Sequence, residues 1–163
     1  MLVVSNTSPI SNLALIGRLR LLHAQFGGVW IPSAVKVELT DLPDAQARAA
    51  IEEAIQGGWL KDRQISAPEL VAVLSAGLHQ GESEAIALGV QLRADLILID
   101  EREARSAAVR LNLRVTGVLG VLLRAKRDGA IGSLRHEVDA LRTKAGFFIA
   151  SHLEQQILRE AGE

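Results

Sequence analysis

The sequence predicts one α/β domain over residues 1–163, a three-layer α/β/α sandwich around a central, mainly parallel sheet. Short apolar strands alternate with amphipathic helices along the whole chain, which is typical of this fold class. Residues 96–99 are apolar at every position, as expected of a parallel strand that is buried on both faces. A length of 163 residues fits one domain, and no linker, internal repeat or low-complexity tract divides it.

The strands are predicted from short apolar runs that end at polar residues, glycine or proline. They are residues 2–4, 29–31, 96–99 and a run that starts at 112 or 113 and ends at 115, with residues 59–65 as a strand or an irregular connection.

The helices are predicted where apolar residues recur every three or four positions. They cover residues 9–15, 19–26, 34–39, 45–55, 68–74, 82–90 and 100–110, a helix ending at 127, one over 133–145 and a last one from 151 onward. Ser33 and Ser151 are placed to cap the helices that follow them. The last helix carries Leu153, Ile157 and Leu158, which can bind a partner or close the core.

Composition limits the kind of protein. Apolar residues make up 48% of the chain, so it is globular, and no apolar run approaches the roughly 20 residues that span a bilayer. No basic segment precedes an apolar run, so no secretory signal is expected. The absence of cysteine excludes disulfides and thiolate metal sites. We therefore expect a cytoplasmic protein without a membrane segment.

The charge balance limits how the chain can bind nucleic acid. A formal net charge of −1 excludes a basic coat protein, so any nucleic-acid site must be a local patch. Aromatic residues make up only 3% and tyrosine is absent, which disfavours base stacking on an aromatic platform.

Polar side chains follow two of the predicted strands. Asn6, Thr7 and Ser8 follow the first strand, and Asp100 and Glu101 follow the strand over residues 96–99. Ligands of open parallel sheets bind outside the carboxyl ends of the strands. These side chains are therefore expected to line one cleft.

Further carboxylates are expected on helix faces that point inward. Glu38 shares a face with Ala34 and Val35, so it either has a partner such as a metal ion or lies at the rim of the core. Glu82 lies one turn before the apolar residues at 85 and 86, and Glu84 lies nearer the edge of the helix. Both also suit a helix N-terminus for electrostatic reasons, and this alternative stays open.

Carboxylates that converge in a cleft repel one another unless a cation lies between them. Hard oxygen ligands suit Mg²⁺ or Mn²⁺. Such a site can orient a water molecule and stabilise the charge of a phosphodiester in its transition state. Arg102 and Arg105 are close enough to the cleft to neutralise phosphates, whereas most other arginines suit solvated helix faces.

Other chemistries have less support. The four histidines are scattered without metal-ligand spacing, and the chain has neither a G-x-S-x-G elbow nor a P-loop. The turn over residues 116–120 can accept a phosphate at a helix N-terminus, although its two glycines more often indicate tight packing.

Several segments, in order, resemble PIN domains. They are Val4-Ser-Asn-Thr-Ser-Pro9, Ile31-Pro with Val37-Glu-Leu39, Gly81-Glu-Ser-Glu-Ala-Ile86 and Leu98-Ile-Asp-Glu-Arg-Glu-Ala-Arg105. The later segment Val115-Thr-Gly-Val-Leu-Gly-Val-Leu-Leu-Arg-Ala-Lys126 resembles a branch described as a domain of unknown function, close to the VapC-type toxins. The resemblance covers essentially the whole chain.

The resemblance implies a metal-dependent endoribonuclease that uses Mg²⁺ or Mn²⁺. It matches Glu38, Glu82 and Asp100 to catalytic carboxylates, which with Asn6 and Glu101 form the implied metal-ligand set. Glu84 is the alternative to Glu82. The resemblance also matches Thr7 and Ser8 to small polar residues that help to position metal waters, while Arg102 and Arg105, by their place near the cleft, are the residues expected to contact RNA.

The resemblance also implies partners. They are RNA, a cognate antitoxin that inserts a side chain into the acidic cleft, and a second copy in a homodimer. The family normally has Asp at the end of the first strand, where this chain has Asn6. An amide can ligate a cation but supplies no charge and cannot act as a base. The alternative is therefore a catalytically inactive or impaired module that binds RNA or a partner protein.

Overall fold

A five-stranded, entirely parallel sheet forms the centre of the protein. The computed structural model describes all residues 1–163 and confirms the α/β/α sandwich. The strands are β1 (Val3–Ser5), β2 (Val29–Pro32), β3 (Leu60–Arg63), β4 (Leu96–Leu98) and β5 (Val115–Thr116), in the spatial order β3-β2-β1-β4-β5. Every neighbouring pair is parallel.

Two strands differ from the sequence prediction. The ambiguous segment over residues 59–65 forms a strand, because residues 60–63 pair in register with β2. The last strand begins at Val115 instead of 112 or 113. The Leu113 amide donates to the Ala108 carbonyl, so this residue still belongs to the turn that closes the preceding helix.

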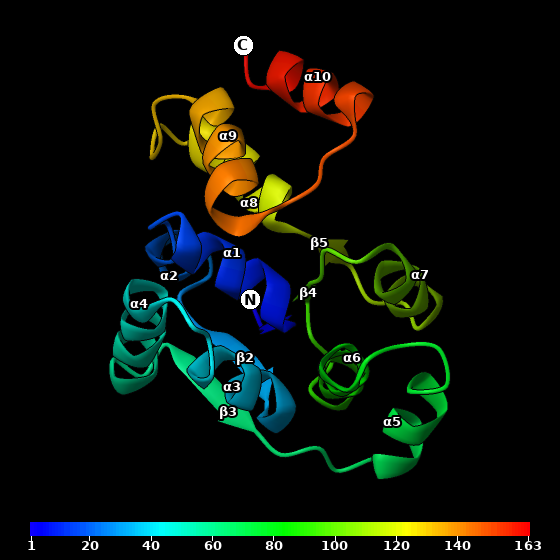
Figure 1. The fold of residues 1–163 in the computed structure, drawn as a ribbon. Coiled ribbons are helices and arrows are strands. Elements are labelled where there is room, and N and C mark those ends of the chain that lie inside the picture. The colour runs from blue at the N-terminus through cyan, green and yellow to red at the C-terminus, as the bar shows by residue number, and fades with distance from the viewer.

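Ten helices surround the sheet (Figure 1). They are α1 (Thr7–Leu15), α2 (Arg20–Phe26), α3 (Ser33–Thr40), α4 (Ala45–Gln56), α5 (Pro68–Leu74), α6 (Gln80–Gln91), α7 (Arg102–Arg110), α8 (Val118–Arg127), α9 (Leu134–Ala145) and α10 (Ser151–Glu160). Figure 1 shows α5, α6 and α7 grouped together, with α8, α9 and α10 gathered at the other end of the molecule. None of the helices combines the length and the apolar character needed to cross a bilayer.

The apolar side chains of the central strands divide between two cores. Val3 of β1 and Leu98 of β4 belong to the larger core, under helices that include α1, α4, α8 and α9. Val4 and Ile97 point to the opposite face and pack with α6 and α7. Successive side chains of a strand alternate between faces, so burial of both faces explains the continuous apolar runs.

The helix starts are partly as predicted. Asp44 and Ser133 cap α4 and α9 through side-chain oxygens that accept amide hydrogen bonds at 2.8 and 3.1 Å. The prediction that Ser33 and Ser151 cap their helices is wrong. Each is the first residue of its helix, and the residue before it takes the cap position. Helix α7 begins at Arg102, not at Asp100, because the Asp100 carboxylate bonds across to the start of α8.

The pairing of β1 with β4 brings two distant segments together. Ser5 lies opposite Leu98, and the backbone N–H of Asn6 donates to the Leu98 carbonyl at 3.0 Å. Both strands run in the same direction, so the residues after them emerge at one edge. The expected cleft between Asn6 and Asp100 therefore has a structural basis.

Candidate active site at the carboxyl edge of the sheet

Asn6 lies at the centre of this edge. It is buried, with 4% of its surface exposed, and it precedes α1 in extended backbone conformation. Its Nδ2 donates to Oε2 of Glu101 at 3.2 Å. The Asn6 side chain thus links the carboxyl end of β1 to that of β4. It gives the Glu101 carboxylate one hydrogen-bond donor but no positive charge.

Asp100 is held by two elements besides its own strand. Its Oδ1 accepts from the Val118 amide at 2.8 Å, and its Oδ2 accepts from the Ser8 hydroxyl at 3.1 Å. Burial raises the pKa of Asp100, the two hydrogen bonds lower it, the neighbouring Glu101 raises it further, and the charge of Arg105 lowers it. The net direction is upward, so this carboxylate lacks sufficient compensating positive charge.

Glu82 is a second carboxylate of the site and is more fully buried than Asp100. Only 7% of its surface is exposed, and its Oε2 accepts from the His79 amide at 3.1 Å, which closes a capping box at the start of α6. Burial raises the pKa of Glu82 more than this hydrogen bond lowers it, and Glu101 and Glu103 raise it further. The helix-terminus interpretation therefore accounts for the position of Glu82 but not for its burial beside other carboxylates.

Glu38 reaches the same edge from α3. Its residue is exposed, so it lies at the rim and is not buried on the apolar face of Val35 and Leu39. A Cβ atom on Gly81 would lie 2.5 Å from the Glu38 Oε1 and 3.4 Å from the Asn6 Oδ1. Glycine at position 81 therefore gives these two oxygens room beside the start of α6.

Glu84, the alternative to Glu82, is not at the edge of its helix as expected. It is 9% exposed, and its Oε2 accepts from the Gln80 side chain at 2.7 Å, one turn earlier on α6. Glu82 instead lines a hollow of about 570 Å³ together with Glu101 and Glu103. Of the two, only Glu82 therefore faces the carboxylates that follow β4.

The donor set suits a hard divalent cation in its chemistry. The side chains present carboxylate and amide oxygens, and the Oγ1 of Thr7 is buried without a hydrogen-bond partner. Such an orphaned hydroxyl in a polar site indicates a place for a water or a ligand. No group of three or more His, Cys, Asp or Glu side chains lies close enough together to hold a metal ion as they stand. Binding would have to draw the carboxylates inward.

The remaining predicted residues lie around this centre. Ser8 is engaged with Asp100, and the Arg105 Nη1 donates to the Ile99 carbonyl at 2.9 Å. Arg102 is exposed and makes no ion pair. Both arginines line a groove with Asp100.

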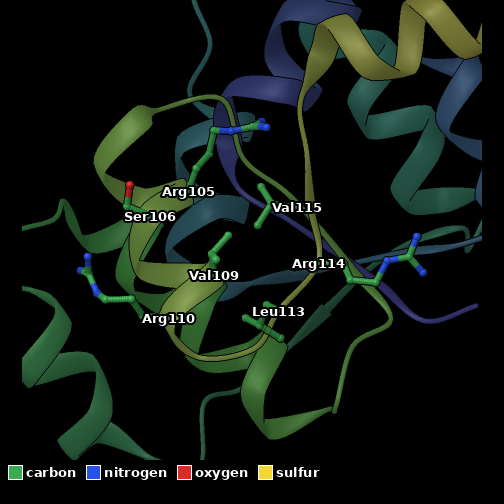
Figure 2. A pocket seen from close by; sticks show the side chains of 7 residues that line it. All are labelled: Arg105, Ser106, Val109, Arg110, Leu113, Arg114 and Val115. Carbon is green, nitrogen blue, oxygen red and sulfur yellow. The ribbon is translucent and has the colours of Figure 1, made fainter.

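A hollow of about 620 Å³ on the other side of Arg105 lies between α7 and β5. Figure 2 shows Val109, Leu113 and Val115 between these elements, with Arg110 and Arg114 extending in opposite directions. Because the guanidinium groups diverge, this hollow offers no convergent set of polar groups.

Sequence reasoning missed Asn12 and underrated two glycines. The Asn12 Nδ2 donates to the Ser8 hydroxyl at 3.1 Å, and Ser8 in turn donates to Asp100. The spacing of four between Ser8 and Asn12 on one helix was the available signal. Gly117 packs against Asp100 and Arg105, and Gly120 against the Thr116 side chain, so the expectation of tight packing in this turn is confirmed.

Comparison with known proteins assigns this chain to a family. The family model DUF3368, described as a PIN domain, matches residues 2–163. The chain belongs to the PIN-domain family. One similar solved structure is a PilT N-terminus domain protein, SSO1118, from the archaeon Sulfolobus solfataricus P2. It is 19% identical with a TM-score of 0.51, and the match covers 77% of this chain and 93% of that chain. No curated protein matches.

The family supports part of the expected chemistry. PIN domains are usually nucleases and generally use divalent metal ions, so a ribonuclease-like fold and a hard-oxygen site agree with membership. The likeness to the archaeal structure, at its low identity, supports the fold alone.

Proposed function

We propose that this PIN-domain protein is a metal-dependent endoribonuclease that hydrolyses RNA phosphodiester bonds. The observation that carries the proposal is a pair of carboxylates at one edge of the sheet, the buried Glu82 and the partly buried Asp100, whose pKa values are raised by burial and by Glu101 and neither of which forms an ion pair. Perturbed carboxylates gathered in a cleft mark candidate functional sites. A divalent cation would provide the missing positive charge.

In this proposal Glu82, Asp100 and Glu38 hold Mg²⁺ or Mn²⁺, with Glu101 and the Asn6 Oδ1 as further oxygen donors. When bound, the metal supplies Lewis-acid stabilisation of the phosphodiester charge and orients a water for attack. Ser8 and Asn12 keep the Asp100 carboxylate oriented, since they form a hydrogen-bonded chain to its Oδ2. By family analogy the products carry a 5′-phosphate and a 3′-hydroxyl.

Asn6 sets the strength of the site. Its Nδ2 faces Glu101, which leaves the Oδ1 near Glu38 and Gly81 as the available donor. With asparagine in place of aspartate, the donor set has one negative charge fewer. We therefore expect weaker metal affinity than an all-carboxylate site would have, and an enzyme that needs higher metal concentrations.

The proposed biological setting is a toxin–antitoxin pair acting in the cytoplasm. It rests on the family resemblance of the whole chain, which also suggests a homodimer and a small antitoxin protein as partners. An antitoxin cation reaching Glu82 and Asp100 would relieve the same charge that a metal relieves. Competition between antitoxin and metal is the expected consequence.

The second candidate is a PIN-like module that binds RNA or a protein without cleaving RNA. One observation favours it: the side-chain Nδ2 of Asn6 already donates to Glu101, so this carboxylate has a hydrogen-bond partner within the chain. Such a module would gain no thermal stability from Mn²⁺.

The deciding experiment is cleavage of a structured RNA pool by the purified protein with Mg²⁺, with Mn²⁺ and with EDTA. Wild type should cleave with either ion and stop in EDTA, and Asp100→Asn should be inactive. Asp128→Asn, at an exposed position after α8, is the matched control and should cleave like wild type. Full metal-dependent cleavage by Asp100→Asn would contradict the assignment, and no cleavage by wild type would favour the silent module.

A further inference from the structure

We propose that the groove between α8 and α10 binds one unpaired nucleobase of single-stranded RNA, next to the phosphate that the site cleaves. This inference rests on the proposed ribonuclease function and names the form of RNA that the site takes. The groove has a volume of about 630 Å³ and begins at Asp100, so a ligand lying in it reaches the acidic edge directly. That volume falls within the range of small-ligand sites.

The wall of the groove is apolar and comes from three segments. Leu119 and Leu123 contribute from α8, Ile149 from the connection before α10, and Leu153 and Ile157 from α10. Ile149 and Ile157 also belong to the larger core, which fixes this wall in place. A flat, largely apolar base face can be buried against such a surface, whereas its polar edges can stay toward the open mouth.

Phe148 stands at this groove and is 86% exposed. Gly146 ends α9 in the left-handed conformation, with φ of 63°, and the chain then turns so that Phe147 is partly buried while Phe148 faces solvent. An exposed phenylalanine forgoes the free energy that burial would give. A single aromatic ring beside an apolar groove is well suited to stacking with one base.

The mouth of the groove has the charge that a nucleotide needs. Arg102 and Arg105 lie there without an ion pair, although five other arginines and two lysines of the chain are paired. The Arg105 guanidinium is held by the Ile99 carbonyl, so its position beside Asp100 is set before any ligand binds. Arg102 and Arg105 can bind the phosphate of a nucleotide, and Phe148 of the same groove can stack on its base.

This arrangement selects single-stranded RNA. A base within a duplex is stacked and paired, so its face cannot enter a groove. The low aromatic content disfavours a platform that stacks several bases, and this proposal needs only the exposed ring of Phe148. We therefore expect one base to be bound beside the cleavage site, with the rest of the strand held through phosphates.

The test is binding of a fluorescein-labelled RNA of about eight nucleotides to the whole protein in EDTA, followed by fluorescence anisotropy. Phe148→Ala should raise the Kd about tenfold, because the stacking contribution of one base is lost. Phe148→Leu keeps an apolar side chain and should also weaken binding. Val73→Ala, which shortens a 72% exposed side chain on α5, is the matched control and should have no effect.

The arginine part is tested in the same assay. Arg102→Gln should weaken binding severalfold at low salt and less at high salt, since a phosphate contact depends on ionic strength. Arg93→Gln, at an exposed turn before β4, is its control. An abasic oligomer of the same length should respond to Arg102→Gln but not to Phe148→Ala.

Three results would overturn the groove assignment: no binding of the single strand, an unchanged Kd in Phe148→Ala, or equal binding of duplex RNA. If Phe148→Ala instead reduces self-association or protein capture while RNA binding is unchanged, a protein occupies the groove. Metal-dependent cleavage with an unaltered KM in Phe148→Ala would refute the groove and leave the ribonuclease standing. Base-dependent binding without cleavage by wild type would refute catalysis and leave the groove standing.

Discussion

Two regions of this protein shield carboxylates from solvent, and in only one of them does a carboxylate form an ion pair with a cation. Glu137 on α9 is 3% exposed, and its Oε1 accepts from the Arg18 Nη2 at 2.7 Å and from the Arg18 Nε at 3.0 Å. At the edge of the sheet, Glu82 is 7% exposed and Asp100 is held only by neutral donors. The first carboxylate belongs to the packing of α9 against the start of the chain. The two carboxylates at the edge of the sheet form no ion pair, and the nearby Arg105 and the hydrogen bonds of Asp100 offset only part of the effect of burial.

The two C-terminal helices contain a similar ion pair between an arginine and a glutamate, at the surface of the protein. Arg142 on α9 donates two hydrogen bonds to the Glu154 carboxylate on α10, and these bonds lower the pKa of Glu154 more than the other contributions raise it. Burial and neighbouring charge raise the pKa of Glu82 and Asp100. The comparison indicates that the site carboxylates oppose folding in their charged form, whereas the paired ones support it. A fold retains such groups when they serve a ligand.

The largest expected effect is on catalysis. Glu82→Gln should reduce the rate of RNA cleavage about a hundredfold or more, since loss of a metal ligand removes several kcal/mol of transition-state stabilisation. The melting temperature in EDTA should stay the same or rise, because a buried charge is removed. Initial rates and thermal melts measure the two effects. Glu52→Gln, on the exposed side of α4, is the control, and a variant with the wild-type rate would shift the assignment to Glu84.

The next effect is on stability at the paired carboxylate. Arg18→Met should lower the free energy of unfolding by about 2 kcal/mol, less than for a fully buried pair because the Arg18 side chain is 41% exposed. The melting temperature should fall by roughly 5 °C, with RNA cleavage unchanged at a temperature where the variant is folded. Arg20→Met removes a cation that is 85% exposed and should have almost no effect. Equal melting temperatures in both variants would remove the contrast between the two regions.

A smaller effect is expected from restoring the charge at position 6. Asn6→Asp should bind Mn²⁺ about tenfold more tightly, because one more carboxylate faces the cation. In EDTA it should be less stable than wild type by about 1–2 kcal/mol, since the hydrogen bond to Glu101 becomes a repulsion between like charges. Melting curves over a Mn²⁺ titration measure both quantities. Asn112→Asp, at an exposed turn, is the control, and a Mn²⁺ affinity that does not change at position 6 would exclude Asn6 from the ligand set.

The smallest effect is a difference in pH dependence between the two regions. Because folding raises the pKa of Glu82 and Asp100, their contribution to stability is full below the unfolded pKa of about 4 and is lost as pH rises through the folded value. Glu82→Gln with Asp100→Asn should therefore gain stability relative to wild type as pH rises above about 4 in EDTA.

Glu154 gives the opposite sign and serves as the matched comparison. Its pKa is lowered by Arg142, so its contribution is present above the unfolded pKa and is lost as pH falls through the folded value. Glu154→Gln should therefore become less stable than wild type as pH rises toward the unfolded pKa of about 4.5, and the difference should stay constant above it. Urea unfolding at several pH values tests both, and parallel curves for the two variants would contradict the comparison.

Much of the fold could be predicted from local patterns. The runs around residues 3–4 and 96–99 are apolar at every position because both faces of the sheet are buried, and this predicted a parallel sheet between helices. The helix starts were less predictable. Ser33 and Ser151 have the right residue type for a cap, but the chain path before each helix puts the preceding residue in that position.

The sequence predicted which residues belong to the candidate site, but it did not predict which contacts they make. The positions of Asn6 and Asp100 after strands predicted that they meet, and the β1–β4 pairing brings them together. Glu38 lies at the rim, one of the two alternatives that its position left open, whereas Glu84 is buried where an edge position was expected. The side of a helix that is covered depends on what packs against it, which periodicity within the helix does not specify.

The sequence by itself determined the fold class, the family and the missing charge at Asn6, because each depends on residue type and order along the chain. Only the tertiary structure decided which carboxylates are compensated. Arg18 and Glu137 are far apart in sequence and meet through helix packing, while neither Glu82 nor Asp100 forms an ion pair, because Arg105 beside Asp100 donates to the Ile99 carbonyl instead. Whether a buried charge stabilises or opposes folding depends on the three-dimensional position of its partners, and this is the physical reason that the site became visible only in the folded chain.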